Sequence, residues 1–318
     1  MIKKSQHYRL LILGSGPAGC TAAIYAARAG LNFAMIVGVE QGGQITKTPK
    51  IANWPGEPND ISGVELMEKI MNQVRNFNTN IVLDTITKAD LSQRPFCLQG
   101  ESPNNEYTCD ALIIATGASP KFLGLPEEQK YLGRGVSTCA ICDGFFYKNK
   151  NVVIVGGGNT AAEEALYLAK LATTVTLVHR RDTLRAEAWL VKQLQQTPNV
   201  QFEWNSVIAE ILGNDAAGVT GVRLRNIERD ISKTIEVTGV FIAIGYQPNT
   251  EVFSSGLEMA NGYIKTGASG GVSAANIAGV FAAGDVVAHN YHQAIVAAGS
   301  GCTAALDAKK FLESGVVG

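Results

Sequence analysis

The chain has 318 residues, a formal net charge of −1 and 17% charged residues. It is longer than one compact domain usually needs, so we expect two domains. The near-zero charge gives no electrostatic reason to expect nucleic acid or an anionic membrane surface as a partner. The sequence also contains no run of the roughly 18 apolar residues that a membrane span requires, so we expect no membrane-spanning segment.

The N-terminal segment does not have the pattern of an export signal. Lys3 and Lys4 precede a short apolar run at residues 10–13, and glycines follow at once. A signal peptide needs a longer apolar stretch and a cleavage site. The chain has six cysteines, which are few for its length and do not suggest the disulfide framework of a secreted fold. We therefore expect a cytoplasmic protein.

A strand, a glycine-rich turn, a helix and a second strand follow one another at two places in the chain. The apolar pattern predicts this βαβ arrangement over residues 8–37 and again over residues 151–178. Apolar runs that end in glycine recur at residues 111–117 and 240–245, at a similar distance after each arrangement. The repetition predicts an α/β fold of two Rossmann-like nucleotide-binding domains, the second inserted into the first.

The domain boundaries are predicted where glycine and proline mark connecting segments. We expect the first domain to consist of residues 1–117 and 246–318. The inserted domain would then consist of residues 118–245. A helix from about residue 294 to residue 312 would end the first domain.

The turn of the first βαβ arrangement fits the dinucleotide fingerprint G-x-G-x-x-G. Its first glycine permits a tight turn, the second lets the backbone approach a pyrophosphate, and the third lets helix and strand pack closely. The helix N-terminus then offers free N–H groups to phosphate oxygens. An acidic ribose ligand is expected about 20 residues later, and Glu40 is the nearest candidate. The fingerprint consists of Gly14, Ser15, Gly16, Pro17, Ala18 and Gly19.

The second βαβ arrangement carries the related form G-x-G-x-x-A. Basic residues follow its second strand. Arginines can bind the 2′-phosphate of NADP in bidentate fashion, whereas an acid would repel it. The alternative is a solvated strand end whose arginines only pair on the surface. We favour an NADPH site made of Gly156, Gly157, Gly158, Asn159, Thr160, His179, Arg180, Arg181 and Arg185.

Two nucleotide-binding domains in one chain suggest two cofactors, a flavin and a nicotinamide donor. Gly284 and Asp285 follow an apolar strand, where an aspartate can accept hydrogen bonds from the ribityl hydroxyls of a flavin. A Gly-Asp pair alone is usually only a turn. The flavin assignment therefore depends on the fingerprints as well.

Cys139 and Cys142 form a C-x-x-C pair at an expected helix start. Two thiols at this spacing can form a reducible disulfide with lowered thiol pKa values. Zinc is the main alternative, but structural zinc needs four ligands, and the sequence has no second Cys/His cluster at a suitable spacing. Two interpretations of the neighbouring Asp143 stay open, an acid/base for thiol–disulfide exchange and a turn or helix cap.

Taken in order, these motifs resemble those of low-molecular-weight bacterial thioredoxin reductases. The specific feature is a C-x-x-C-D inside the nicotinamide domain, because high-molecular-weight disulfide reductases carry their pair near the first fingerprint. The resemblance runs from about residue 8 to residue 312. It implies two Rossmann-like FAD/NAD(P)-binding domains, a homodimer with one FAD in each subunit, NADPH as electron donor and thioredoxin as partner.

The resemblance also assigns roles to individual residues. It implies that Cys142 is the sulfur next to the flavin, that Cys139 attacks the thioredoxin disulfide and that Asp143 is the acid/base. It further implies that the inserted domain rotates between the two half-reactions. The implied FAD site adds to the first fingerprint Val37, Gly38, Val39, Glu40, Gln41, Gly42, Gly43, Gln44, Asn53, Thr116, Gly117, Gly284, Asp285, His292, Gln293 and Ala294.

His292 departs from the family pattern, which commonly has Arg before Gln-Ala, so one flavin contact is expected to differ. Two other functions stay open. The chain could be an enzyme on the same scaffold that reduces a peroxiredoxin-type or low-molecular-weight disulfide. It could also be a non-catalytic NADP-binding redox sensor with Cys139 and Cys142 as its switch.

Overall fold

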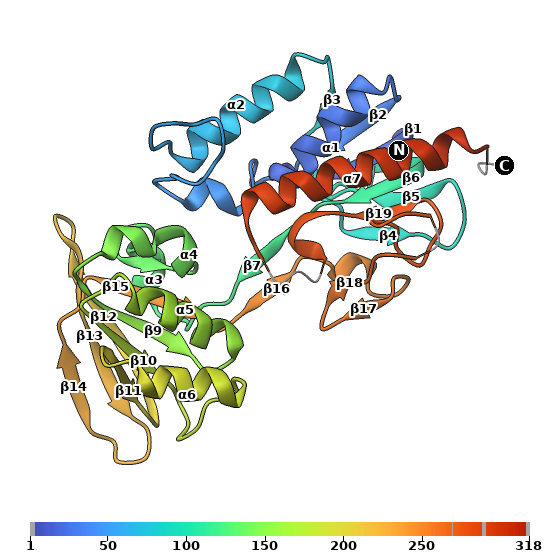
Figure 1. Cartoon of the computed structure of the whole chain (residues 1–318). Helices are drawn as coiled ribbons and strands as arrows, with labels where there is room; N and C mark the ends of the chain where they lie inside the picture. Colours follow the sequence, from blue (N-terminus) through green and yellow to red (C-terminus); the bar gives the residue numbers. More distant parts are fainter. Residues whose placement is uncertain (1–3, 269, 288–290, 316–318) are drawn as a thin grey trace. The chain divides into compact units, whose positions relative to one another are not determined.

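The computed structural model describes residues 4–268, 270–287 and 291–315. The chain divides into two compact units (Figure 1). Unit 1 consists of residues 1–119 and 247–318, and unit 2 consists of residues 120–246. Each unit contains a parallel β-sheet with helices packed on it. The α/β fold class predicted from the sequence is confirmed.

The sheet of unit 1 has the strand order β3-β2-β1-β6-β5-β4, and β19 also pairs with β6. The pairs among β3, β2, β1, β6 and β19 are parallel, whereas β4 and β5 are antiparallel to their neighbours. The strands are β1 (Lys4–Leu13), β2 (Phe33–Ile36), β3 (Asn80–Val82), β4 (Lys88–Asp90), β5 (Phe96–Gln99), β6 (Asn105–Ile114) and β19 (Val280–Ala282).

The helices of unit 1 are α1 (Pro17–Arg28), α2 (Gly63–Arg75) and α7 (Ala294–Glu313) in the part that the structure describes. Figure 1 shows α7, in red, running alongside α1, and the two helices are in direct contact. Small residues permit this approach, because a side chain on Gly301 would place its Cβ 2.1 Å from the Ala18 carbonyl oxygen. The predicted C-terminal helix therefore packs on the fingerprint helix.

Unit 2 repeats this arrangement. Its parallel sheet has the order β11-β10-β9-β15-β8, beside an antiparallel sheet β12-β13-β14. The strands are β8 (Val136–Ser137), β9 (Asn151–Gly156), β10 (Thr174–Val178), β11 (Val200–Glu203), β12 (Ser206–Asn214), β13 (Gly218–Asn226), β14 (Ser232–Ile235) and β15 (Gly239–Ala243). The helices are α3 (Pro126–Lys130), α4 (Ala140–Asp143), α5 (Asn159–Ala169) and α6 (Ala188–Gln196).

Both faces of the parallel sheet in unit 2 are buried. In β9, Val152 and Ile154 belong to the core beneath α5 and α6, whereas Val153 and Val155 belong to the core shared with β12 and β13. Successive side chains of a strand point to opposite faces, so a strand buried on both sides must be apolar throughout. This is why the sequence shows an uninterrupted apolar run here.

Short elements complete the chain. β7 (Ala118–Pro120) and β16 (Tyr246–Pro248) pair with each other at the two points where the chain passes between the units. β17 (Met259–Ala260) and β18 (Tyr263–Ile264) form a small hairpin. The 3-10 helices are η1 (Gln44–Lys47), η2 (Gly144–Tyr147), η3 (Glu251–Phe253) and η4 (Gly284–Val286).

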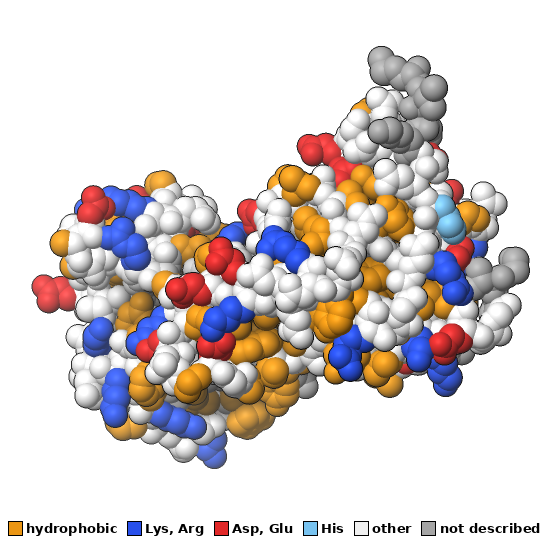
Figure 2. All heavy atoms as spheres, turned by 90° about the horizontal axis from the view of Figure 1, so that it is seen from above, with side chains coloured by type: hydrophobic (Ala, Val, Ile, Leu, Met, Phe, Trp, Pro, Cys, Tyr) orange, Lys and Arg blue, Asp and Glu red, His pale blue; other side chains and the backbone are white. Residues whose placement is uncertain are grey.

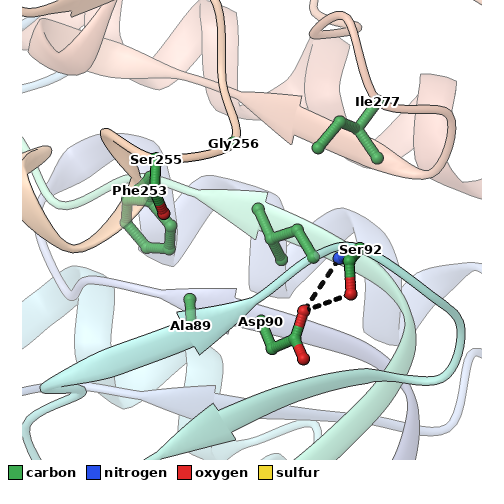
Figure 3. Close-up of a pocket in the computed structure, with 8 residues that line it drawn as sticks. Ala89, Asp90, Ser92, Phe253, Ser255, Gly256 and Ile277 are labelled. Atoms are coloured by element: carbon green, nitrogen blue, oxygen red, sulfur yellow. Dashed lines mark hydrogen bonds between the residues drawn. The ribbon is translucent and has the colours of Figure 1, made fainter.

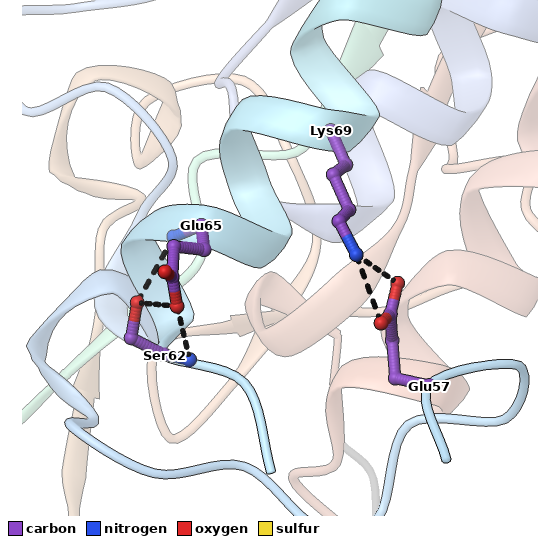
Figure 4. Close-up of polar contacts among 4 residues, drawn as sticks. All are labelled: Glu57, Ser62, Glu65 and Lys69. Atoms are coloured by element: carbon purple, nitrogen blue, oxygen red, sulfur yellow. Dashed lines mark hydrogen bonds and ion pairs between the residues drawn. The ribbon is translucent and has the colours of Figure 1, made fainter. Parts of the chain in front are cut away.

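The start of α2 is fixed by a capping box (Figure 4). The Ser62 hydroxyl accepts a hydrogen bond from the Glu65 amide at 3.2 Å, and the Glu65 carboxylate accepts one from the Ser62 amide at 3.0 Å. Lys69, one turn further, pairs with Glu57 at 2.7 Å. These contacts satisfy otherwise free amides and attach the loop before α2 to the helix.

The face drawn in Figure 2 carries lysine and arginine side chains interspersed with aspartate and glutamate. No large patch of one charge is visible on that face, in agreement with the formal net charge of −1.

Candidate functional site

The fingerprint of unit 1 forms the turn between β1 and α1, and its backbone fits closely into the sheet. Gly14 has φ +110°, and a Cβ there would lie 2.2 Å from the Ala115 carbonyl oxygen. A Cβ on Gly19 would lie 2.0 Å from the Gly14 carbonyl oxygen, whereas the space beside Gly16 is free to 3.9 Å. These close approaches bring the N-terminus of α1 to the end of β1, which is where such a turn binds a pyrophosphate.

Ser15 joins this turn to the segment after β2. Its hydroxyl donates to the Val37 carbonyl at 3.0 Å and accepts from the Gly42 amide at 3.1 Å. The predicted segment 37–44 therefore lies against the fingerprint. Glu40, the candidate ribose ligand, is exposed, and its carboxylate lies 3.3 Å from the Lys47 ammonium.

Further predicted FAD residues follow the carboxyl ends of β6, which pairs in parallel with β1, and of β19, which pairs in parallel with β6. Gly284 and Asp285 begin η4 after β19, and the Gly284 amide donates to the Ser300 hydroxyl at 2.8 Å. Thr116 follows β6, and its hydroxyl donates to the Asn249 carbonyl at 2.6 Å. Parallel sheets bind nucleotides beyond this edge, so the arrangement brings these predicted residues to the place where FAD would bind.

The N-terminus of α7 contributes the last group of predicted FAD residues. His292 Nδ1 lies 3.5 Å from Asp285 Oδ1, and Asn53 Nδ2 donates to Gln293 Oε1 at 3.4 Å. These polar side chains come from three separate segments of unit 1. Together with the fingerprint turn at the N-terminus of α1, they fit a ligand that has a pyrophosphate and several hydroxyls, such as FAD.

The fingerprint of unit 2 has the same construction between β9 and α5. A Cβ on Gly156 would lie 2.4 Å from the Ala243 carbonyl oxygen, and one on Gly157 would lie 2.2 Å from His179 Cε1. Gly158 has no atom within 4 Å of its Cβ position. The loop is therefore closed toward the protein and open at Gly158, as a nucleotide phosphate requires.

The His179 ring packs against this loop at Gly157. Its side chain is buried, and burial lowers its pKa, so the imidazole is held neutral. The positive charge comes instead from Arg180, Arg181 and Arg185, which are exposed. The Arg185 amide donates to the Gly157 carbonyl at 2.7 Å, which fixes the basic segment beside the fingerprint. These residues fit the adenosine phosphates of NADPH.

Asn159 holds the same segment at a second point. Its side-chain amide donates to Glu187 Oε1 at 3.1 Å, and its side-chain oxygen accepts from the Glu187 amide at 2.9 Å. The first residue of α5 is thereby attached to the chain just before α6. Sequence reasoning did not anticipate Glu187.

Cys139 and Cys142 form a disulfide at the start of α4. The Cys142 amide donates to the Cys139 sulfur at 3.2 Å, and the Asp143 amide donates to the Cys139 carbonyl at 3.1 Å. Both cysteines are partly exposed. The pair can therefore be reached by a second disulfide.

Asp143 is held beside the pair by Ser137, a residue that sequence reasoning missed. The Ser137 hydroxyl donates to Asp143 Oδ2 at 2.6 Å and accepts from the Cys139 amide at 3.1 Å. Burial raises the pKa of Asp143, and the bond from Ser137 opposes the shift. The Asp143 side chain makes no capping bond to η2. The structure therefore gives no support to capping of η2 by Asp143, and the acid/base role stays a prediction.

A second carboxyl, Glu164 on α5, also reaches the cysteine turn. Its Oε1 accepts from the Ala140 amide at 3.3 Å. Burial is the main reason that the pKa of Glu164 is raised to about 7. Nothing in the linear spacing pointed to this residue, because it lies 22 residues after Cys142 and reaches the turn only through the packing of α5 against α4.

Other features of the described residues do not join these sites. A pocket in unit 1, with a volume of about 280 Å³, is lined by none of the predicted site residues. Figure 3 shows its lining. Four cysteines lie outside the Cys139–Cys142 disulfide: Cys20 and Cys109, which are buried, and Cys97 and Cys302, which are partly buried. Within residues 4–268, 270–287 and 291–315 there is no group of three or more His, Cys, Asp and Glu side chains placed to hold a metal. No helix in these ranges has the length and apolar character needed to cross a membrane.

A family model described as pyridine nucleotide-disulphide oxidoreductase matches residues 8–301. The chain belongs to this family. An enzyme of this family requires nucleotide-binding sites and a reducible disulfide, and the two glycine fingerprints and the Cys139–Cys142 pair match these requirements.

Individual relatives show which members of the family this chain is similar to. The thioredoxin reductase of Vibrio cholerae is 54% identical, with 97% of this chain and 98% of the relative covered. A glucosaminate ammonia-lyase of Pseudomonas fluorescens is 50% identical, with 97% of each chain covered. Among solved structures, the thioredoxin reductase of Giardia duodenalis gives a TM-score of 0.91 at 41% identity, over 97% of this chain and 99% of that one.

These comparisons confirm the recognition made from the motifs. The chain is related over nearly its whole length to low-molecular-weight thioredoxin reductases, as predicted. The predicted enzyme class, an NADPH-dependent flavoprotein disulfide reductase, and the predicted cofactors FAD and NADPH are confirmed with it. Because one close relative is described by another activity, the substrate must be argued from this chain's own residues.

We expect Gly157→Ala to destabilise unit 2 and to weaken NADPH binding. The new methyl group would overlap the His179 ring, and overpacking of this kind typically costs about 1–3 kcal/mol. Thermal unfolding and NADPH titration of the purified enzyme measure the two effects. Gly158→Ala is the control for stability, because its Cβ position is open. The double change Gly157→Ala/His179→Ala should cost less stability than the sum of the two single changes, because the overlap is absent without the ring. Additive losses would contradict the packing explanation.

We expect Asp143→Asn to change how stability depends on pH. An aspartate whose folded pKa is raised loses its proton in the unfolded chain first, so wild-type stability falls as pH rises above about 4. Asparagine does not titrate. The melting temperature of the oxidised variant, relative to wild type, should therefore increase as the pH rises above about 4 and should level off above the folded pKa of Asp143. A difference that stays constant from about pH 3 upward would show that burial does not raise the Asp143 pKa.

Proposed function

We propose that this chain is a thioredoxin-disulfide reductase that uses NADPH, FAD and the Cys139–Cys142 disulfide. One observation carries the proposal. The disulfide lies in unit 2 at the start of α4, in the same unit as the basic NADPH-type fingerprint, and α4 packs on the fingerprint helix α5. A reducible pair beside a nicotinamide-binding helix fits an enzyme that transfers electrons to another disulfide.

The residues of each unit fit one cofactor. We propose that FAD binds the fingerprint at Gly14–Gly19, the segment 37–44 and the α7 N-terminus with Asp285, and that NADPH binds Gly156–Thr160 with Arg180, Arg181 and Arg185. When bound, NADPH supplies a hydride and FAD relays the electron pair to the disulfide. The protein's part is to position these groups and the two sulfurs.

The reduced pair then performs thiol–disulfide exchange. The Cys139 thiolate attacks one sulfur of the thioredoxin disulfide, and the other thioredoxin sulfur leaves as a thiolate that takes a proton from solvent. Cys142 next attacks Cys139, which re-forms the enzyme disulfide and releases the second thioredoxin thiol. The Cys142 amide already points at the Cys139 sulfur and would stabilise a thiolate there. We propose that Asp143 takes the Cys142 proton and gives it to the second leaving thiolate, in keeping with its raised pKa and its bond from Ser137.

We propose further that unit 2 turns about its two connections to unit 1 between the half-reactions. The nicotinamide site and the dithiol belong to one unit, and one flavin face would not serve both at once. The connections are single strands, β7 and β16, and such segments can act as hinges. A crosslink between the units that leaves turnover unchanged would disprove this motion.

A homodimer remains a prediction that rests on the resemblance, and a cytoplasmic location remains one that rests on the N-terminal sequence and the cysteine content. The two alternative functions differ from the proposal in turnover and substrate. A redox sensor would change state once, whereas a reductase consumes NADPH continuously. A reductase of another disulfide would oxidise NADPH with that acceptor and not with thioredoxin.

The proposal is tested by mixing the purified holoenzyme with NADPH and following the nicotinamide absorbance with and without oxidised thioredoxin. Sustained oxidation that requires thioredoxin supports the proposed substrate. Reduction of FAD without thioredoxin-dependent turnover would overturn it and direct the search to other disulfides.

We expect Cys142→Ser to separate the two half-reactions. NADPH should still bleach the FAD absorbance, because the residues that fit both cofactors are intact, while thioredoxin reduction should fall by at least about a thousandfold, to the background without the enzyme pair. Anaerobic spectroscopy and the thioredoxin assay measure the two steps on one preparation. A folded, FAD-loaded variant that no longer bleaches would contradict this division.

A further inference from the structure

Helix α5 belongs to both functional parts of unit 2. Its first residues, Asn159 and Thr160, belong to the NADPH-type fingerprint, and its second turn presents Glu164 to the cysteine pair. Glu164 is partly buried and faces α4, whereas the adjacent Glu163 is exposed. One rigid helix thus connects the fingerprint with the redox-active turn.

The contact is made at the residue that follows Cys139. The Ala140 amide, which is at the N-terminus of α4, donates to Glu164 Oε1 at 3.3 Å, and the Ala140 side chain is completely buried. The packing around this contact is close, because a Cβ on Gly144 would lie 2.9 Å from Tyr167 Cε1 on α5. The Glu164 carboxyl therefore fixes the backbone between the two cysteines against α5.

We infer that Glu164 is a positioning residue of the redox centre, which holds the Cys139–Cys142 turn in the geometry for disulfide closure and adds a titratable charge next to it. The inference rests on the proposed function for its biological meaning, but it concerns the chemistry of the pair itself. Asp143 and Glu164 then have different tasks. Asp143 moves protons at the sulfurs, and Glu164 acts through the Ala140 amide.

The surroundings give Glu164 an unusual response to pH. Burial raises its pKa to about 7, the bond from Ala140 opposes the shift, and the charge of Glu163 adds to it. Several other titratable groups lie on the elements that surround α5. They are Asp143 and Cys142 on α4, Cys139 directly before α4, Tyr147 on η2, Lys192 on α6 and Glu203 on β11. Lys192 is exposed and Glu203 pairs with Lys233. The strands β9, β10 and β15 carry none.

The sign of the effect follows from this pKa. Below about pH 7 the Glu164 carboxyl is neutral and leaves the thiol pKa values unchanged. Above that pH it is an anion, which disfavours a second negative charge on a nearby thiolate. The thiols of the reduced pair should therefore become less reactive above about pH 7 than a single thiol ionisation would predict.

The test uses the holoenzyme reduced with dithiothreitol and freed of the reductant. Iodoacetamide labelling of the peptide that contains Cys139 and Cys142 reports the thiolate fraction between about pH 6 and pH 9. Closure of the dithiol by oxidised glutathione reports the positioning. Glu164→Gln keeps a hydrogen-bond acceptor but no charge, and Glu164→Ala removes both. The control is Glu236→Gln, which removes one exposed charge of unit 2.

We expect Glu164→Gln to be labelled about three- to tenfold faster than wild type near pH 8 and at the wild-type rate near pH 6. The reason is that the substitution removes a negative charge only at the pH values at which the wild-type Glu164 carboxyl is ionised. Its dithiol should close at nearly the wild-type rate. Glu164→Ala should close several-fold more slowly, and Glu236→Gln should match wild type in both measurements.

A labelling profile of Glu164→Gln that coincides with wild type would overturn the electrostatic part. Equal closure rates in Glu164→Ala and Glu164→Gln would overturn the positioning part. Neither measurement uses NADPH or thioredoxin. If thioredoxin-dependent turnover were absent in wild type while these differences were present, the proposed function would fail and the role of Glu164 would stand.

Discussion

In each unit two backbone segments lie so close together that only glycine, which has no side chain, fits at the contact. In unit 1 the turn after β1 approaches the end of β6, where a Cβ on Gly14 would lie 2.2 Å from a carbonyl oxygen. In unit 2 the turn after β9 approaches the end of β15 in the same way, at Gly156. This approach brings a helix N-terminus to the carboxyl edge of a parallel sheet and creates the surface for a nucleotide.

The redox centre is built on the second of these surfaces. The cysteine turn is not an independent motif, because Ser137 at the end of β8 and Glu164 on α5 both bond to it. The strand that positions Ser137 pairs with β15, and α5 starts at the glycine loop beside that strand. The nicotinamide-type loop, the disulfide and two carboxyls with raised pKa values are therefore parts of one small framework.

Features that a few adjacent residues determine could be predicted from the sequence, whereas contacts that depend on the packing of distant segments could not. The strands near residues 8–13 and 151–155, the glycine loops and the cysteine pair are each encoded in a few adjacent residues, so they could be recognised. Glu40, the candidate ribose ligand by its position after β2, has its carboxylate beside Lys47, and its role stays a prediction. Ser137, Glu164 and Glu187 act across the fold, and their spacing in the sequence carries no signal of it.

The central claim is that the Cys139–Cys142 pair exchanges electrons covalently with thioredoxin. Trapping the mixed disulfide tests it most directly. Reduced Cys142→Ser and Cys139→Ser enzymes would each be mixed with oxidised thioredoxin and analysed by intact mass and peptide mapping. The account predicts a covalent one-to-one adduct through Cys139 in the Cys142→Ser enzyme. The absence of any adduct in both variants, with the proteins folded and FAD-loaded, would contradict it.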